Sequence, residues 1–287
     1  ISSKAAKTIT FSFEAGEKHK QLKTIEALYE ELIINHFDRQ DLLIALGGGV
    51  VGDMTGYAAA TYLRGIDFVQ VPTTLLSQVD SSIGGKTGVD FAQYKNMVGA
   101  FNQPKLVYMN LDVLKTLPKE QFASGMAEAL KSGLIRDQEY FTYLCDEIKA
   151  IQSLEQEAIL RTVSGSCKIK REVVQNDPKE KGERALLNFG HTIGHAIEKL
   201  SDFTLYHGEC VALGMVAAAY ISFKSGNISK EDLEKIEHII SAYNLPIRLK
   251  TAKMSADDVL AATKSDKKME DGKLKFVLLK KIGKAVI

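Results

Sequence analysis

A short apolar segment that runs directly into glycines is the feature that most constrains the fold of this chain. Residues 41–46 are almost continuously apolar, which is typical of a strand buried on both faces of a parallel sheet. Gly47, Gly49 and Gly52 then satisfy the pattern G-x-G-x-x-G ahead of a predicted helix over residues 53–63. Such glycines let backbone N–H groups approach a pyrophosphate, although a tight turn without a ligand explains the same pattern.

Further strand and helix patterns alternate along the first part of the chain. Residues 8–13 alternate polar and apolar side chains, and residues 68–71 and 105–109 are further strand candidates. Residues 21–35 carry apolar side chains at helical spacing. Strands separated by helices predict a Rossmann-like parallel α/β sheet. Asp67 has roughly the spacing of a ribose-binding acid, but it opens a strand rather than closing one, so the dinucleotide fingerprint is imperfect.

Helical periodicity takes over after Leu117 and Pro118. The predicted helices cover residues 119–132, 138–148, 154–174, 188–200, 208–225 and 230–243. Residues 274–279 are the one strand predicted in this part. We therefore expect two domains, an α/β domain over residues 1–118 and an all-helical domain over residues 119–287.

Composition limits the classes of partner and compartment. A formal net charge of +1 in a chain of 287 residues gives no bulk attraction to nucleic acid. The longest apolar run, residues 211–223, is shorter than the ~20 residues of a membrane span, and no signal peptide is visible. Three scattered cysteines are too few for a disulfide framework or a cysteine-based zinc site, so we expect reduced thiols in a cytoplasmic protein.

One acid and three histidines lie in segments that suggest a site. Glu128 occupies an apolar helical stretch, and with Lys131 it forms either a surface ion pair or a buried group that needs a partner such as a metal. His191 and His195 share a helix face, but a threonine replaces the glutamate of the protease motif H-E-x-x-H. His207 opens another apolar helix. A carboxylate with two imidazoles is a common ligand set for catalytic Zn²⁺, and by spacing alone His195 is a possible ligand beside His191.

A polar loop and scattered cations suggest an anionic ligand. Residues 80–90 resemble a P-loop, but Ser81 stands where the first glycine is required. Lys86 therefore either grips a phosphate or belongs to a polar surface loop. Arginine suits a carboxylate and lysine suits a phosphate, so the cations together fit a substrate that carries both groups. The further basic residues concerned are Lys95, Lys131, Lys170, Arg184, Lys267 and Lys268.

Several motifs together resemble the 3-dehydroquinate synthase family, over about residues 10–287. The motifs occupy residues 47–53, 71–74, 78–87, 125–131, 187–195 and 207–209. The resemblance implies a nucleotide-binding α/β domain, a helical metal-binding domain and a homodimer, with NAD, Zn²⁺ (or Co²⁺) and a sugar phosphate in the cleft between the domains. It also implies that an N-terminal segment of the family, which forms part of the adenosine pocket, is absent here.

The resemblance assigns a role to individual residues. It takes Glu128, His191 and His207 as the metal ligands and turns His195 toward the substrate phosphate. The implied NAD contacts are Gly47, Gly48, Gly49, Asp53, Thr73, Thr74, Lys95, Glu17, Lys20 and Thr116. The implied substrate contacts are Asp80, Lys86, Asn96, Lys131, Lys170, Arg184, Asn188, His195 and Lys267, with Arg64 lent by the neighbouring subunit. The implied catalytic residues are Glu180 and His195, in acid–base roles, with Lys131, Lys86 and Arg184.

The activity implied is conversion of 3-deoxy-D-arabino-heptulosonate 7-phosphate to 3-dehydroquinate and phosphate, a step of the shikimate pathway to aromatic amino acids. The steps would be alcohol oxidation by NAD, phosphate elimination, carbonyl reduction, ring opening and aldol closure. Three alternatives remain open. One is another sugar-phosphate cyclase such as 2-deoxy-scyllo-inosose synthase, whose substrate lacks the carboxylate. The others are a metal-dependent polyol or glycerol dehydrogenase and a non-catalytic NAD-binding oligomer.

Overall fold

The computed structural model describes residue 5 and residues 7–92, 94–202, 204–249, 254–264, 269–270 and 273–287. The chain forms two compact units, and each is described by itself. Unit 1 comprises Ile1–Pro72 and Gly85–Met109, and unit 2 comprises Thr73–Gly84 and Asn110–Ile287. The sequence predicted one domain boundary, near residue 118. In the structure the chain passes between the units three times: it enters unit 2 at Thr73, returns to unit 1 at Gly85 and enters unit 2 again at Asn110.

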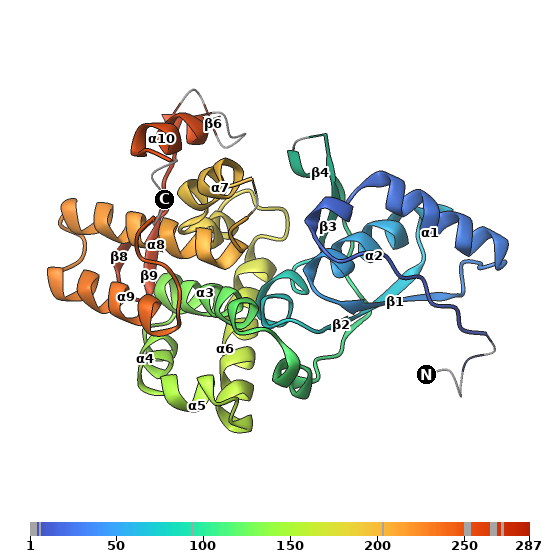
Figure 1. The fold of residues 1–287 in the computed structure, drawn as a ribbon, viewed down its shortest axis with the longest axis horizontal. Helices are drawn as coiled ribbons and strands as arrows, with labels where there is room; N and C mark the ends of the chain where they lie inside the picture. The colour runs from blue at the N-terminus through green and yellow to red at the C-terminus, as the bar shows by residue number, and fades with distance from the viewer. Residues whose placement is uncertain are drawn as a thin grey trace. The chain divides into compact units, whose positions relative to one another are not determined.

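Unit 1 is built on a three-stranded parallel sheet. The strands are β1 (Leu42–Gly47), β2 (Asp67–Pro72) and β5 (Leu106–Val107), in the order β1–β2–β5. The other elements are η1 (Glu17–His19), α1 (Leu22–Ile34), α2 (Gly49–Thr61), η2 (Tyr62–Arg64) and the antiparallel pair β3 (Lys86–Phe91) and β4 (Tyr94–Phe101) (Figure 1). The helix predicted over residues 21–35 and the strands predicted near residues 41, 68 and 105 are confirmed.

A single core cluster joins the helices of unit 1 to its strands. Ile25 of α1, Met54 of α2 and Phe68 of β2 belong to this cluster, as does Leu43 of β1. Strand β1 alternates between exposed and buried side chains, so the prediction that both of its faces are buried was wrong. The core cluster, to which α1, α2 and β3 contribute side chains, covers the face of β1 that carries Leu43. Leu46 lies on the opposite face and is 67% exposed.

Two further differences from the sequence predictions concern strand pairing. Residues 8–13 form no strand, although their alternation survives as half-buried and exposed side chains and packs Phe13 against the core cluster. Residues 86–91 form strand β3 instead of a polar surface loop, and Thr87, Gly88 and Val89 are buried. Neither outcome follows from local pattern, because a strand needs a partner that lies elsewhere in the chain.

Unit 2 is mainly helical. Its longer helices are α3 (Lys119–Arg136), α4 (Gln138–Asp146), α6 (Gln156–Asn176), α7 (His191–Leu200), α8 (His207–Lys224), α9 (Lys230–Ala242) and α10 (Ala256–Lys264) (Figure 1). Shorter elements are η3 (Ser77–Ser81), η4 (Leu111–Thr116), α5 (Ile148–Gln152), η5 (Glu183–Asn188), β6 (Met269–Glu270), β7 (Lys273–Leu274), β8 (Leu278–Lys281) and β9 (Lys284–Val286). The six predicted helices are confirmed, with α7 beginning three residues later than predicted because η5 precedes it.

The C-terminal strand prediction over residues 274–279 is displaced. Strand β8 begins at Leu278 and pairs with β9 as an antiparallel hairpin, in which Leu279 is buried while Leu278 is half-buried and Lys280 is exposed. Small hairpins therefore accompany the helices of unit 2. In the part of the chain that the structure describes, no helix combines the length and the apolar character needed to cross a membrane.

Candidate functional site

Three helices of unit 2 bring together the acid and two of the histidines singled out in the sequence. Glu128 lies in the middle of α3, His191 is the first residue of α7, and His207 is the first residue of α8. One potential ligand atom from each of the three lies within 4.8 Å of the others. Glu128 is only 1% exposed, and both histidines are partly buried. Of the two alternatives left open by the sequence for Glu128 and Lys131, the structure excludes the surface ion pair, because Lys131 is also only 2% exposed.

Glycines let these helices approach closely enough to form the cluster. A Cβ at Gly208, next to His207, would lie 2.2 Å from the backbone oxygen of Ser124 on α3. The Gly208 N–H also donates a hydrogen bond to the Ser124 Oγ at 2.9 Å. A Cβ at Gly214 of α8 would lie 1.8 Å from the oxygen of Gly190, which caps the start of α7. Backbone-to-backbone contact of this kind fixes the histidines relative to Glu128.

The spacing of the donor atoms fits a tetrahedral metal ion. The Glu128 Oε1 lies 3.5 Å from the His191 Nε2 and 3.4 Å from the His207 Nε2. Metal–ligand bonds of about 2.0–2.2 Å place neighbouring ligands of a tetrahedral zinc ion about 3.3–3.6 Å apart. A direct hydrogen bond would usually be shorter, at about 2.7–3.2 Å. One carboxylate and two imidazoles also leave a fourth position open, as catalytic zinc sites do.

Electrostatics hold the acid of this cluster in its charged form. Burial raises the pKa of Glu128, but the positive charges of Lys131 and of protonated His207 outweigh it and lower that pKa to about 2. Lys131 lies one turn further along α3 and forms an ion pair with Glu128. A carboxylate that is buried and ionised at neutral pH is prepared to bind a cation, since no proton must be displaced from it.

The second ring nitrogen of each candidate ligand faces an acceptor. The His191 Nδ1 lies 3.2 Å from the backbone oxygen of Phe189, which favours a proton on Nδ1 and a free lone pair on Nε2. The His207 Nδ1 lies 3.7 Å from the Oε1 of Glu198. Glu198 is a residue that the sequence analysis missed. Its position seven residues after His191 and three after His195 on α7 was the signal that could have found it.

His195 is next to the cluster but is not one of the three residues that meet at Glu128. Its ring centroid lies 5.2 Å from that of His191 and 6.3 Å from that of His207. Together with Glu198 and His207 it forms a second set of possible ligand atoms within 4.8 Å of one another. His207 thus belongs to both candidate sets, whereas His195 belongs only to the second.

Two cations predicted to bind the substrate are buried within unit 2 and contact oxygen atoms. The Lys170 Nζ donates to the Asp80 carboxylate at 2.7 Å and to the Asp80 backbone oxygen at 2.6 Å. Arg184 is 2% exposed and donates to the backbone oxygen of Gly84 at 3.1 Å. Burial lowers the pKa of Lys170 although Asp80 opposes the shift. Burial would raise the pKa of Asp80, but Lys170 outweighs it and the pKa is lowered.

A tight turn before α7 presents Glu180, which was predicted to act in acid–base catalysis. The Asp177 carboxylate accepts hydrogen bonds from the backbone N–H groups of Lys181, Gly182 and Arg184. Glu180 lies inside this turn with φ at 54°, a left-handed backbone conformation, and its Oε1 accepts a hydrogen bond from the Asn188 Nδ2 at 3.0 Å. The turn thus brings together Glu180 and Asn188, both predicted site residues.

Unit 1 gathers five other predicted residues into one polar cluster. The Lys20 Nζ donates to the Asp53 Oδ2 and to the Asn96 Oδ1, both at 2.6 Å. Glu17 lies 3.9 Å from the Lys20 Nζ and 3.4 Å from the Lys95 Nζ. Burial lowers the pKa of Lys20, but the carboxylates of Asp53 and Glu17 outweigh it and raise that pKa. Asp53 lies in the first half of α2, which begins at the glycine turn.

The remaining predicted residues are more dispersed. Gly47 ends β1, Gly48 is the N-cap of α2 and Gly49 begins that helix. Lys86 opens β3 on an exposed position, and Arg64 is exposed at the end of η2 with φ at 69°. Thr73, Thr74 and Thr116 belong to unit 2, where the Thr74 Oγ1 donates to the Ser77 Oγ at 2.9 Å. Lys267 and Lys268 lie outside the described residues.

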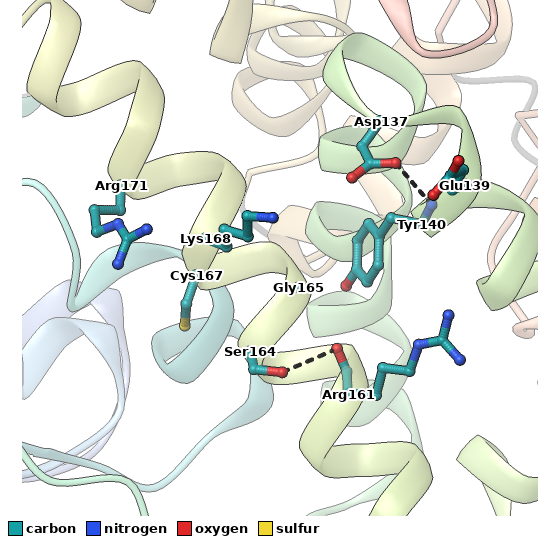
Figure 2. A pocket seen from close by; sticks show the side chains of 9 residues that line it. All are labelled: Asp137, Glu139, Tyr140, Arg161, Ser164, Gly165, Cys167, Lys168 and Arg171. Carbon is teal, nitrogen blue, oxygen red and sulfur yellow. Dashed lines mark hydrogen bonds between the residues drawn. The ribbon is translucent and has the colours of Figure 1, made fainter.

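An open pocket elsewhere in unit 2 contains none of the predicted site residues. It measures about 540 Å³ and lies against α6, α4 and the residue that links α3 to α4 (Figure 2). Its lining consists of Asp137, Glu139, Tyr140, Arg161, Ser164, Gly165, Cys167, Lys168 and Arg171. Burial raises the pKa of the Cys167 thiol to about 11, so this sulfur is not a reactive thiolate. The pocket offers no counterpart to the chemistry of the Glu128 cluster.

Comparison with known structures defines the class of protein. The structure of 2-epi-5-epi-valiolone synthase from Streptomyces hygroscopicus subsp. jinggangensis 5008, with NAD⁺ and Zn²⁺ bound, matches 96% of this chain and 76% of that chain with a TM-score of 0.89 and 28% identity. A 2-deoxy-scyllo-inosose synthase complexed with carbaglucose-6-phosphate, NAD⁺ and Co²⁺ matches 96% of this chain and 76% of that chain with a TM-score of 0.86 and 29% identity. The fold and the Glu-His-His cluster therefore define a sugar-phosphate cyclase.

Sequence comparison specifies the family within this class. Residues 10–124 match the family described as 3-dehydroquinate synthase N-terminal, and residues 125–269 match 3-dehydroquinate synthase C-terminal. The 3-dehydroquinate synthase of Prochlorococcus marinus (strain MIT 9215) is 47% identical over 276 residues, which are 95% of this chain and 76% of that protein. The chain belongs to the 3-dehydroquinate synthase family.

Proposed function

We propose that this protein converts 3-deoxy-D-arabino-heptulosonate 7-phosphate to 3-dehydroquinate and phosphate. The observation that carries the proposal is that both parts of the 3-dehydroquinate synthase family match in sequence, over residues 10–124 and 125–269. The Glu128, His191 and His207 cluster supplies a donor set with the spacing that such metal-assisted chemistry requires. The enzyme is then a phosphate-eliminating lyase.

In this proposal the metal and NAD are held by different sets of residues. Glu128, His191 and His207 of unit 2 would hold Zn²⁺ or Co²⁺. The NAD contacts in unit 1 would be Gly47, Gly48, Gly49, Asp53, Lys95, Glu17 and Lys20, joined by Thr73, Thr74 and Thr116 of unit 2. When bound, NAD⁺ accepts a hydride and returns it, and the metal lowers the pKa of the hydroxyl group that is oxidised.

The substrate carboxylate is assigned to Lys170 and Arg184. Both side chains are buried, so each is removed from competing water, and a charge interaction gains strength in such surroundings. Asp80 and the Gly84 carbonyl hold the two cations in fixed positions, which favours recognition of a planar anionic group. Phosphate contacts are assigned to Lys86, Asn96, His195 and Lys267, with Lys131 and Asn188 as further substrate contacts.

Acid–base work is assigned to Glu180 and His195. Asn188 donates a hydrogen bond to Glu180 and keeps its carboxylate oriented within the turn. His195 stands beside His191 and His207, so a proton on its ring lies close to any group bound at the cluster. A positioned acid or base of this type contributes about 10²–10⁴-fold to a rate.

We also propose a homodimer in the cytoplasm. Arg64 is the residue that would be lent to the neighbouring subunit, and its exposed position on a left-handed turn suits such a role. Sedimentation analysis tests the oligomeric state directly. An Arg64→Ala variant that still dimerises but loses turnover would support the lent arginine, whereas unchanged turnover would remove it from the site.

The decisive experiment incubates the protein with the heptulosonate phosphate, NAD⁺ and Zn²⁺ and follows phosphate and 3-dehydroquinate together. Equal amounts of both, without accumulation of NADH, are expected, because the hydride is returned in each cycle. Net NADH release would instead identify a polyol dehydrogenase. Phosphate release only from a hexose phosphate without a carboxylate would identify a 2-deoxy-scyllo-inosose synthase type of cyclase. No reaction with any of these substrates would leave a non-catalytic NAD-binding protein.

A further inference from the structure

A buried acid behind the metal cluster has no part in the reaction described above. Glu198 lies on α7 and is 5% exposed. Its Oε1 is 3.7 Å from the Nδ1 of His207, while the Nε2 of the same ring is 3.4 Å from the Glu128 Oε1. The His207 ring therefore lies between two carboxylates, one on each of its nitrogen atoms.

The two candidate histidine ligands differ in what orients them. The His191 ring is held by the backbone oxygen of Phe189, which lies two residues before His191, just ahead of α7. His207 is likewise the first residue of its helix, α8. Its Nδ1 is met instead by a side chain from α7. An imidazole that binds a metal must present a lone pair on one ring nitrogen. An acceptor facing the other nitrogen keeps the proton there and so determines which nitrogen can bind the metal.

We propose that Glu198 is a positioning residue whose carboxylate faces the Nδ1 of His207, favours the proton on that nitrogen and so directs the Nε2 lone pair toward the metal. This inference rests on the metal site proposed above. A buried carboxylate is costly unless it has a partner, and the cluster formed by Glu198, His195 and His207 supplies imidazole nitrogens for that purpose. Carboxylate–histidine–metal triads fix the tautomer and the ring orientation, and their loss lowers metal affinity about 10–100-fold.

The test compares Zn²⁺ affinity in Glu198→Ala, Glu198→Gln and the unaltered protein, by competition with a chromophoric chelator at one fixed pH. Glu198→Ala should lose about 10–100-fold in affinity. Glu198→Gln keeps an acceptor oxygen and the shape of the side chain, so it should recover part of that loss. Lys199→Ala, at the exposed neighbouring position on α7, is the matched control and should bind Zn²⁺ normally.

A second readout separates metal geometry from general damage. The visible absorption of bound Co²⁺ reports the ligand field, and it should change in Glu198→Ala more than in Glu198→Gln, while the thermal unfolding of the metal-free variants is compared in parallel. Unchanged Zn²⁺ affinity and Co²⁺ spectrum in both variants would overturn the role of Glu198. Failure of the unaltered protein to bind Zn²⁺ would instead overturn the metal site itself, so the two ideas fail in distinguishable ways.

Discussion

The contact between α8 and α3 at Gly208 predicts how tightly the metal cluster depends on backbone packing. In Gly208→Ala the new Cβ would lie 2.2 Å from the Ser124 backbone oxygen and 2.4 Å from its Cα. Ordinary contact begins at 3.4 Å, so the start of α8 must move by about 1.2 Å, because the obstructing atoms are backbone. Overpacking of this kind costs about 1–3 kcal/mol of unfolding free energy. Since His207 precedes Gly208, the same movement would take its Nε2 out of the tetrahedral spacing to Glu128.

The assay measures thermal unfolding with and without Zn²⁺, together with chelator competition. An ion that binds only the folded protein stabilises it by about 2.7 kcal/mol at a concentration of 100 times its Kd. We expect Gly208→Ala to lose this increment and at least about 100-fold in affinity, the upper end of what disturbed support of a ligand costs. The control is Gly226→Ala, just beyond the other end of α8, where φ is 73° and no atom lies within 4 Å of the new Cβ. Gly226→Ala should lose stability through backbone strain yet keep its zinc increment. A normal zinc increment in Gly208→Ala would refute the reasoning.

Three further predictions concern the same unit. His191→Ala should abolish zinc retention and turnover, and normal zinc content by atomic absorption with a normal rate would remove His191 from the ligand set. Arg184→Ala should weaken substrate binding by about 1.5–3 kcal/mol and NAD binding far less, as measured by titration calorimetry, because a charged hydrogen bond is lost; equal losses would contradict a carboxylate role. Burial lowers the pKa of His207, but the neighbouring carboxylates of Glu128 and Glu198 outweigh it and raise that pKa to about 9. Zinc binding at pH 7 should therefore release about one proton, and zinc affinity should increase up to about pH 9. Calorimetry in buffers of different ionisation enthalpy measures this proton, and its absence would contradict the shift.

Local pattern in the sequence was sufficient for the helices. Apolar residues at helical spacing predicted α3 and α6 to α9, because that period is a property of a single segment. The run into Gly47 predicted β1 and the helix after it. The unusual flanks of Glu128, His191 and His207 marked these residues as candidate ligands, and the structure brings their potential ligand atoms within 4.8 Å of one another. The preference for His207 over His195 came from the family resemblance and stays a prediction.

Tertiary structure decided what depends on partners far apart in the chain. Strand β3 and its pairing with β4, the exposed face of β1, and the place of Thr73–Gly84 in unit 2 require contacts that no local period encodes. Burial of Lys131 likewise depends on which helices surround α3. Glu198 illustrates the division most clearly. In sequence it is one acid among many on amphipathic helices, and only the approach of α8 to α7 turns it toward the ring of His207.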